Sequence, residues 1–188
     1  DGKTLFFTDN DLGDPNLVMM DMDSGDVTIL SEIFTDLWFD MNPAGDTLVF
    51  VKKIGHGTAI YSLPLDSGAA AIRLSYETDP RNPVFSVDGS LVVYTARDMF
   101  GSKNLYTIQP DGSAYKKVTS FSDPADAVLP VGITTLESSI LYVMPSQTIK
   151  NQFEIWSITL DGSSDQFLTV CTLEADDHPK ISPNGEKV

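Results

Sequence analysis

Short runs of apolar, β-branched and aromatic residues alternate with polar turns along the whole chain. The clearest example is residues 83 to 119, PVFSVDGSLVVYTARDMFGSKNLYTIQPDGSAYKKVT, in which two Asp-Gly turns separate short apolar segments. Such runs predict antiparallel strands, because Asp-Gly and Ser-Gly pairs supply the positive φ angles of tight hairpins. No segment carries the i, i+3, i+4, i+7 apolar stripe of an amphipathic helix, so we expect almost no helix.

One motif, a strand that ends in Asp or Asp-Ser before Gly, occurs four times. Its glycines are Gly25, Gly68, Gly112 and Gly162, which lie 43, 44 and 50 residues apart. The first residue of each preceding apolar run recurs at nearly the same interval, at Leu5, Leu48, Leu91 and Ile140. So does the hydroxyl residue that ends each unit, at Ser31, Ser75, Thr119 and Thr169. Three independent markers with one period predict a protein of four similar units.

The second strand of each unit is apolar at consecutive positions instead of alternating. A strand of this kind is buried on both faces, as expected when small sheets stack face to face around an axis. The fourth unit is longer by about five residues, within SFSDPADAVLPVGITT at 120 to 135. This insertion lengthens the approach to the strand that follows, and recognition residues are often carried on such loops.

A further segment precedes the first turn of three units. It reads TDLWFDMNPAGD at 35 to 46, TDPRNPVFSVDGS at 78 to 90 and DDHPKISPNGEK at 176 to 187. It resembles the P-x-[WF]-S-P-D-G motif of the TolB-like, or PD40 (WD40-like), β-propeller repeats. The matching residues are Pro83, Phe85, Ser86, Asp88 and Gly89, then Pro179, Ser182, Pro183 and Gly185, and in the second unit Asn42, Pro43 and Gly45. The fourth copy hardly matches.

The resemblance implies an all-β fold, a β-propeller of four-stranded antiparallel blades with about four blades' worth of chain. The innermost strand of each blade would lie next to a central channel. The implied parts of the propeller domain, 1 to 188, are the outer strands of blade one at 1 to 32, blade two at 36 to 76, blade three at 80 to 121, blade four at 126 to 170, and an innermost strand at 175 to 188. That last strand either closes a small four-blade ring or begins a further blade of a larger propeller, and we keep both alternatives.

Charge limits the choice of partner. The chain has 12 Lys and Arg against 27 Asp and Glu, a formal net charge of −15. This acidity disfavours nucleic acid as a partner, and it serves either solubility or the binding of a basic partner or cations. No apolar run approaches the roughly 20 residues needed to span a bilayer. The single cysteine, Cys171, predicts no internal disulfide, and no zinc or haem motif is present.

Polar residues just before each innermost strand would gather at one mouth of the channel. They are Asp36, Asp79, Arg81, Asn82, Asp123, Asp126, Asp176, Asp177 and His178, and we call this set the rim. Converging carboxylates would focus a negative potential suited to a cation or a basic peptide, whereas the alternative is that each Asp only shapes its own turn. His178 beside two carboxylates is not a recognised metal-ligand spacing, so no metal site is predicted.

Signals for catalysis and for cofactors are weak. The segment TDNDLGDPN at 8 to 16 alternates Asp and Asn like a calcium loop but lacks the remaining EF-hand residues. There is no G-x-S-x-G elbow, and the two histidines, His56 and His178, lie in a Gly-rich loop and at the rim. We therefore predict a protein without enzymatic activity and without a cofactor, calcium being the one candidate ion.

Three functions remain from the sequence. The leading one is a TolB-like scaffold that binds a protein or peptide, in the periplasm or outside the cell. The second is a propeller that gates access to the catalytic domain of a larger enzyme, similar to prolyl-oligopeptidase-like or tricorn-like peptidases. The third is a structural component of an extracellular assembly whose acidic surface binds cations. The start of the chain, which is not Met and lacks a signal-peptide pattern, indicates a processed product or a segment of a longer one.

Overall fold

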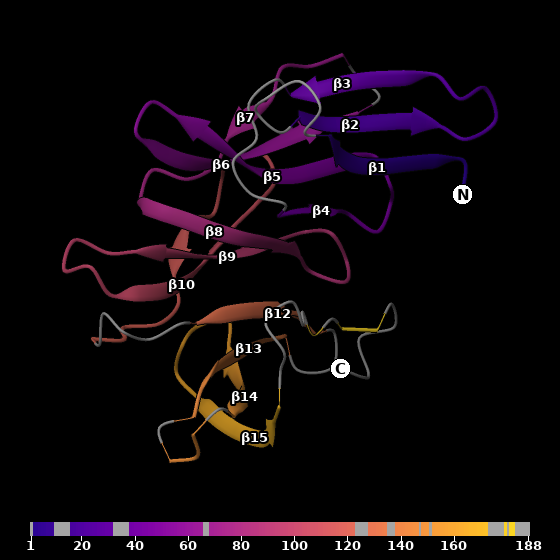
Figure 1. Cartoon of the computed structure of the whole chain (residues 1–188). Helices are drawn as coiled ribbons and strands as arrows, with labels where there is room; N and C mark the ends of the chain where they lie inside the picture. The colour runs from indigo at the N-terminus through magenta and orange to yellow at the C-terminus, as the bar shows by residue number, and fades with distance from the viewer. Residues whose placement is uncertain are drawn as a thin grey trace.

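The computed structural model describes residues 2–9, 16–31, 38–65, 68–122, 128–134, 138–146, 148–150, 152–172, 179 and 181–182. Within these ranges the chain forms four antiparallel sheets and no helix. This confirms the all-β architecture predicted from the turn and strand pattern. Figure 1 shows the four sheets following one another in chain order, from indigo to yellow.

In every sheet the strands are ordered as they are in the chain. The first sheet contains β1 (Thr4–Asp9), β2 (Asn16–Asp21) and β3 (Val27–Ser31). The second contains β4 (Phe39–Met41), β5 (Thr47–Ile54), β6 (Gly57–Pro64) and β7 (Ile72–Arg73). The third contains β8 (Thr78–Phe85), β9 (Val92–Arg97), β10 (Lys103–Ile108) and β11 (Lys116–Lys117). The fourth contains β12 (Leu129–Ile133), β13 (Ser139–Pro145), β14 (Phe153–Thr159) and β15 (Asp165–Cys171).

The hydrophobic core lies between neighbouring sheets. One cluster joins the second and third sheets and includes Val49, Ile60 and Tyr94. Another joins the third and fourth and includes Leu105 and Tyr142. A third, around Leu17, Leu48 and Phe50, joins the first and second. Because each buried large side chain contributes about 1.5 to 3 kcal/mol, these three interfaces hold the sheets together in sequence.

The second strand of a sheet is buried on both faces in three of the four sheets. Residues 48 to 51 of β5 are at most 1% exposed, and the consecutive apolar residues of β9 and β13 are also buried. The prediction of doubly covered strands is therefore confirmed for these. It is wrong for the first sheet, in which β1 holds the position equivalent to β5, β9 and β13, and its Leu5 is 44% exposed. The reason is that, among the residues that the structure describes, the first sheet packs against the second alone, through Phe6 and Leu17.

The hydroxyl residues that end the repeat units have a structural role in two sheets. Ser75 Oγ accepts a hydrogen bond of 2.7 Å from the backbone N–H of Ile60 on β6. Thr119 Oγ1 accepts one of 2.9 Å from the N–H of Leu105 on β10. Both bonds are buried, so a hydroxyl at this position replaces a ladder bond where the short outer strand ends. This accounts for a hydroxyl residue at Ser75 and at Thr119.

In the described ranges we find no helix that is long and apolar enough to cross a lipid bilayer.

Candidate binding site at the inner strands

The first strands of three sheets, β4, β8 and β12, surround a common cavity of about 350 Å³. Residues 179, 181 and 182 complete its wall. Most of the lining side chains are apolar, among them Trp38, Phe39, Val84 and Leu129. The cavity lies where the sequence predicted a central channel, because β8 contacts the first strands of both neighbouring sheets, β4 and β12. We call it the channel cavity.

Bonds between inner strands fix the wall of the channel cavity. Asp40 Oδ2 on β4 accepts a hydrogen bond of 2.8 Å from the backbone N–H of Phe85 on β8. Ser86, just after β8, forms a parallel β-bridge with Ile133 on β12. Each of these contacts crosses from one sheet to the next. The cavity is therefore built by the packing of three sheets and is present before any ligand binds.

Ile181 contacts the fourth sheet from the far end of the chain. It packs with Val131, Leu141 and Val143. A Cβ atom placed on Gly132 of β12 would lie 2.9 Å from Ile181 Cδ1, and the φ of Gly132 is +151°. Glycine at this position thus leaves room for the isoleucine against β12. The predicted strand at 175 to 188 otherwise lies outside the described residues.

Three of the predicted rim residues are described by the structure, and all three lie on β8. Asp79 and Asn82 adopt left-handed φ angles of 52° and 53°, and the pairing of β8 with β9 shifts register next to each of them. Asp and Asn tolerate this conformation better than other residues with a side chain. Asn82, which is 6% exposed, lines the channel cavity. Asp36, Asp123, Asp126, Asp176, Asp177 and His178 lie outside the described residues.

Asp79 is surrounded by cations. Its Oδ1 accepts a hydrogen bond of 2.8 Å from Arg81 Nε, and its Oδ2 lies 3.5 Å from Arg97 Nε. Burial lowers the pKa of Lys103, and the nearby Arg97 and Arg81 lower it further while Asp79 opposes them. Among the described rim residues, the carboxylate of Asp79 thus contacts two arginines. That the rim as a whole binds a cation or a basic peptide stays a prediction.

A second cavity, of about 410 Å³, opens beside these residues. It is lined by Lys53, His56, Gly57, Thr58, Thr78, Asp79 and Arg81. Two of the predicted rim residues therefore face this cavity, while Asn82, three positions after Asp79, faces the channel. Residues two positions apart share one face of a strand, so Asp79 and Arg81 lie on one side of β8 and Asn82 on the other.

Comparisons with known proteins bear on the fold. No family model matches the chain, and no curated protein matches it. Among solved structures, a protein from Agrobacterium tumefaciens assigned as TolB superposes with a TM-score of 0.78 at 18% identity, over 99% of this chain and 69% of that one. TolB from Acinetobacter baumannii superposes with a TM-score of 0.72 at 19% identity, over 99% of this chain and 45% of that one. The fold is that of a TolB-type β-propeller.

Enzyme-associated propellers are similar too. The β-propeller domain of the Trilobed protease from Pyrococcus furiosus, described as having an open velcro topology, superposes with a TM-score of 0.63 at 11% identity, over 90% of this chain and 54% of that one. Identities this low establish the fold alone. In the vocabulary of that fold, the four sheets are blades, and β4, β8 and β12 are the innermost strands of three of them.

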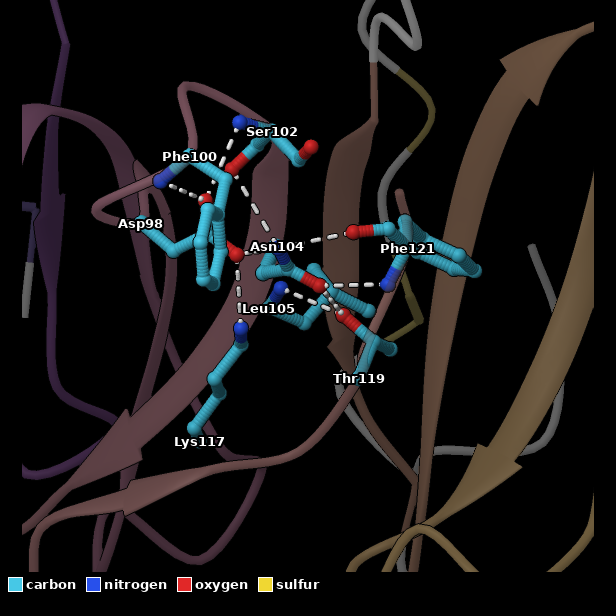
Figure 2. Close-up of polar contacts among 8 residues, drawn as sticks. All are labelled: Asp98, Phe100, Ser102, Asn104, Leu105, Lys117, Thr119 and Phe121. Carbon is cyan, nitrogen blue, oxygen red and sulfur yellow. Dashed lines mark hydrogen bonds and ion pairs between the residues drawn. The ribbon is translucent and has the colours of Figure 1, made fainter. Parts of the chain in front are cut away.

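The hairpin between β9 and β10 of the third blade is held by a partly buried polar network (Figure 2). Asp98 Oδ1 accepts hydrogen bonds from the backbone N–H groups of Phe100 and Ser102, at 3.0 and 3.1 Å. Asp98 Oδ2 accepts from Lys117 Nζ at 2.9 Å and from Asn104 Nδ2 at 3.2 Å. The tip of this propeller hairpin, Met99 and Phe100, is 90% and 80% exposed. An apolar tip is thus presented to solvent on an ordered base.

Asn104 connects this hairpin to the segment that leaves the blade. Its side chain is fully buried and accepts hydrogen bonds at Oδ1 from Thr119 Oγ1, at 3.0 Å, and from the Phe121 N–H, at 2.7 Å. Its Nδ2 also donates to the carbonyls of Ser102 and Phe121, at 3.2 and 3.4 Å. Figure 2 shows the amide between the two segments. The Asn104 amide therefore holds in place the segment after β11, through which the chain leaves the third blade.

Sequence reasoning missed several residues of these sites. Asp40 was read only as part of a repeat motif, since nothing local indicates that it bonds a strand 45 residues away. Arg97 and Lys103 could have been recognised from the sequence. They stand directly opposite each other in the β9–β10 pair, and like charges in that position are destabilising without a partner. Within the described ranges no group of three or more metal-ligating residues is found.

Proposed function

We propose that this chain is a non-enzymatic propeller that binds another protein, and that a segment of the partner enters the channel cavity. The observation that carries the proposal is the cavity itself, with its volume of about 350 Å³ and mostly apolar wall. Ligand sites in proteins are typically concave, largely apolar and formed in advance, with a few polar groups that fix orientation. Here Asn82 and Ser86 supply such polar groups.

The chemistry of the wall favours an extended, mainly apolar segment. Aromatic residues such as Trp38 and Phe39 offer flat surfaces of the kind enriched at protein interfaces. The predicted rim would meet the residues that flank this segment, and the exposed Met99 and Phe100 would add an apolar contact outside the channel. Because the hydrogen-bonded base already orders the backbone of this hairpin, covering the tip costs mainly the entropy of the two side chains.

A tryptophan placed in the channel tests the proposal. Val87 lines the cavity and belongs to none of the core clusters, so Val87→Trp fills the cavity with little disturbance of the packing. Val27 on β3 is 57% exposed, so Val27→Trp is the matched control. Tagged wild-type protein and both variants would be used to capture partners from the source organism, and the affinity of each recovered partner would then be measured with purified components.

The proposal requires a partner whose affinity falls at least tenfold, about 1.4 kcal/mol, in Val87→Trp and is unchanged in Val27→Trp. Equal affinity of both variants for every recovered partner would exclude the channel as the binding site. Circular dichroism must show that both variants are folded, since unfolding of Val87→Trp would also lower its affinity for the partner.

Similarity to the Trilobed protease propeller favours one further candidate, a propeller that gates the catalytic domain of a larger peptidase. In that case the channel would admit substrate peptides instead of holding a partner. The sequence of the gene beyond residue 188 distinguishes the two candidates, because the gating function requires a catalytic domain in the same protein.

We place the protein in the periplasm or outside the cell, as part of the same proposal. The similarity to TolB structures and the acidic composition support this location. Fractionation of cells that express the full-length gene would test it, and recovery in the cytosolic fraction would contradict it.

A further inference from the structure

The fourth blade ends in a long strand, β15, whose outer edge has no neighbouring strand among the described residues. β15 is the last strand in the order β12-β13-β14-β15 and pairs with β14. Figure 1 shows it as the outermost strand of this blade. It is seven residues long, and its first six residues are exposed. The backbone N–H and C=O groups on the outer edge of such a strand can pair with a further strand.

The outer strands of the two middle blades are protected against such pairing. β7 and β11 contain two residues each, and they carry Arg73, Lys116 and Lys117. Short length and charged side chains are two devices that prevent sheet edges from joining. β15 contains no Lys, Arg or Pro. Its one irregularity, at Leu168, separates the stretches 165 to 167 and 169 to 171, which both pair with β14.

Three apolar side chains are exposed along β15. Phe167, Leu168 and Val170 are 47%, 44% and 40% exposed. Phe167 and Val170 stand opposite Trp156 and Glu154 in the β14–β15 pair. Trp156 packs on the cluster between the third and fourth blades, so these two side chains lie on the face directed toward the third blade. A further blade on the opposite face of the fourth sheet would not cover them.

The strand is held in place at its start. The hydroxyl of Tyr142, a buried residue of β13, donates to the carboxylate of Asp165, at 2.9 Å from Oδ1 and 2.8 Å from Oδ2. The ring of Phe167 meets the ring of Trp156 edge to face, with 5.6 Å between their centroids. Because these contacts order β15 in advance, a partner that pairs with it pays mainly for its own ordering.

Charge favours a basic partner over a second copy of this chain. From residue 150 to residue 177 the sequence contains one cation, Lys150, and six acidic residues, Glu154, Asp161, Asp165, Glu174, Asp176 and Asp177. Lys116 of the third blade also reaches the turn before β15, where its Nζ donates to the carbonyl of Leu160 at 2.9 Å. The whole chain has a net charge of −15. Two copies would therefore repel each other, whereas a basic strand would be attracted.

We propose that the outer edge of β15 is a second binding site, separate from the channel cavity, where an extended basic segment of another protein adds a strand to the fourth blade. In this mode of recognition backbone hydrogen bonds supply affinity, and alternate side chains supply specificity. Side chains of the segment on the same face as Phe167 and Val170 are apolar, because apolar cross-strand pairs stabilise a sheet. The side chains between them are Lys or Arg, which suit the acidic surroundings.

A synthetic strand with this pattern tests the site in the intact 188-residue chain. The probe is the acetylated and amidated peptide Lys-Val-Lys-Val-Lys-Val-Lys. One matched peptide has all its internal peptide nitrogens methylated, which keeps the charge and removes the backbone donors. Another has Glu in place of every Lys. Affinities would be measured by calorimetry at about 0.15 M salt, where the screening length is about 8 Å.

Amide hydrogen exchange of the wild-type protein locates the bound peptide. We expect the Lys-Val peptide to bind in a saturable way and to slow exchange within residues 165 to 171, because its strand covers the outward N–H groups. Neither matched peptide should do so. Binding of the methylated peptide with equal affinity would overturn the proposal, since it would show that attraction between charges is sufficient. Binding without slower exchange in β15 would overturn it as well.

Val170→Lys places a charge on the edge, which hinders strand addition and repels a basic segment. The new side chain stands opposite Glu154, so the sheet itself should not be destabilised. Ile149→Lys is the matched control, because Ile149 is 44% exposed and lies in the β13–β14 hairpin of the same blade. The affinity for the Lys-Val peptide should fall at least tenfold in Val170→Lys and stay close to wild type in Ile149→Lys. Equal affinities in the two variants would contradict strand addition at β15.

Analytical ultracentrifugation of the protein without peptide tests the other occupant. Dimerisation that Val170→Lys prevents and Ile149→Lys permits would assign the edge to a second copy of the chain and overturn the proposal of a basic partner. Because the exchange experiment uses wild-type protein, the proposal stays testable if Val170→Lys does not fold. Val87→Trp should bind the peptide like wild type, so failure of the channel proposal and failure of this one are distinguishable.

Discussion

Asp40 Oδ2 accepts a 2.8 Å hydrogen bond from the backbone N–H of Phe85, a residue 45 positions later in the chain. The bond joins β4 of the second blade to β8 of the third, and both residues line the channel cavity. Phe85 is 5% exposed, so its N–H has little access to water. One carboxylate thus links two inner strands across the interface between the blades.

Replacing Asp40 with alanine should destabilise the protein. Hydrogen bonds to charged groups contribute about 1.5 to 3 kcal/mol, and the N–H of Phe85 would be left buried without its acceptor. We expect a loss in that range from urea unfolding. Asp23→Ala, which removes a carboxylate paired at 3.4 Å with Lys3 at the surface, should cost much less. Equal losses of unfolding free energy in the two variants would show that the hydrogen bond from Phe85 to Asp40 contributes no more than a surface ion pair.

The Asp-Gly turn of the fourth blade should tolerate substitution less well than that of the third. Gly162 and Gly112 have similar φ angles, +77° and +88°. A Cβ on Gly162 would overlap the backbone carbonyl oxygen of Val118, whereas on Gly112 it would meet only Ile72 Cγ2 at 4.0 Å. Gly112→Ala should cost about 1 to 2 kcal/mol for the left-handed conformation alone.

Gly162→Ala should cost more than Gly112→Ala by at least about 1 kcal/mol, since small-to-large changes in packed sites typically cost about 1 to 3 kcal/mol. The two variants would be compared by equilibrium unfolding under identical conditions. Because the turns share sequence and conformation, the difference isolates the contact between the third and fourth blades. Indistinguishable free energies of unfolding would mean that this contact relaxes without cost.

Replacing Asn104 with aspartate should destabilise the protein more than replacing it with alanine. Asn104→Asp removes the amide that donates to Asp98 Oδ2, Ser102 O and Phe121 O, and it brings a second carboxylate beside Asp98. An unpaired buried charge costs about 3 to 5 kcal/mol, against about 1 to 3 kcal/mol for the unsatisfied groups that alanine leaves.

Chemical denaturation at pH 7 and at about pH 4 would measure the effect at Asn104. The gap between the two variants should narrow at the lower pH, because the introduced carboxyl becomes protonated and can donate a proton again. A gap that does not change with pH would indicate that steric fit, and not charge, determines the loss.

The turn carboxylates should make the fold sensitive to acid. Hydrogen bonds from Thr159 and Ser163 hold the pKa of Asp161 well below its usual value of 3.8. Ser113 does the same for Asp111, and Ser86 and Ser90 do so for Asp88. A carboxyl whose pKa is lower in the folded state stabilises the fold above its unfolded pKa, and this contribution is lost as the pH falls through the folded value.

Melting temperatures measured between pH 6 and pH 2 should therefore fall below about pH 4. Asp161→Asn should melt at a lower temperature than wild type at pH 6 and should converge toward it in acid. Asp23→Asn, which removes an equal charge at an exposed position, controls for the relief of general repulsion in this acidic chain. Parallel curves for wild type and Asp161→Asn would contradict the assignment of acid sensitivity to this turn.

The sequence alone determined the repeat and the local elements. Asp111 and Gly112 form a hairpin turn because both the carboxylate partner and the positive φ come from residues within a few positions. Strands such as residues 92 to 97 could be recognised from their consecutive apolar residues. These properties depend on near neighbours in the chain. A sequence pattern that recurs every 43 to 50 residues is therefore enough to predict them.

Only the tertiary structure decided which repeats meet and what charge a site carries. The rim was predicted from the carboxylates that recur before each innermost strand. In the structure, Asp79 contacts Arg81 and Arg97, because β9 folds back beside β8 with two irregularities in register. The hydrogen bond from the Phe85 N–H to Asp40 and the approach of Gly162 to Val118 likewise cross between blades. The electrostatic potential at a site and the packing around a residue both depend on all the residues nearby in space. The sequence pattern does not specify which residues those are.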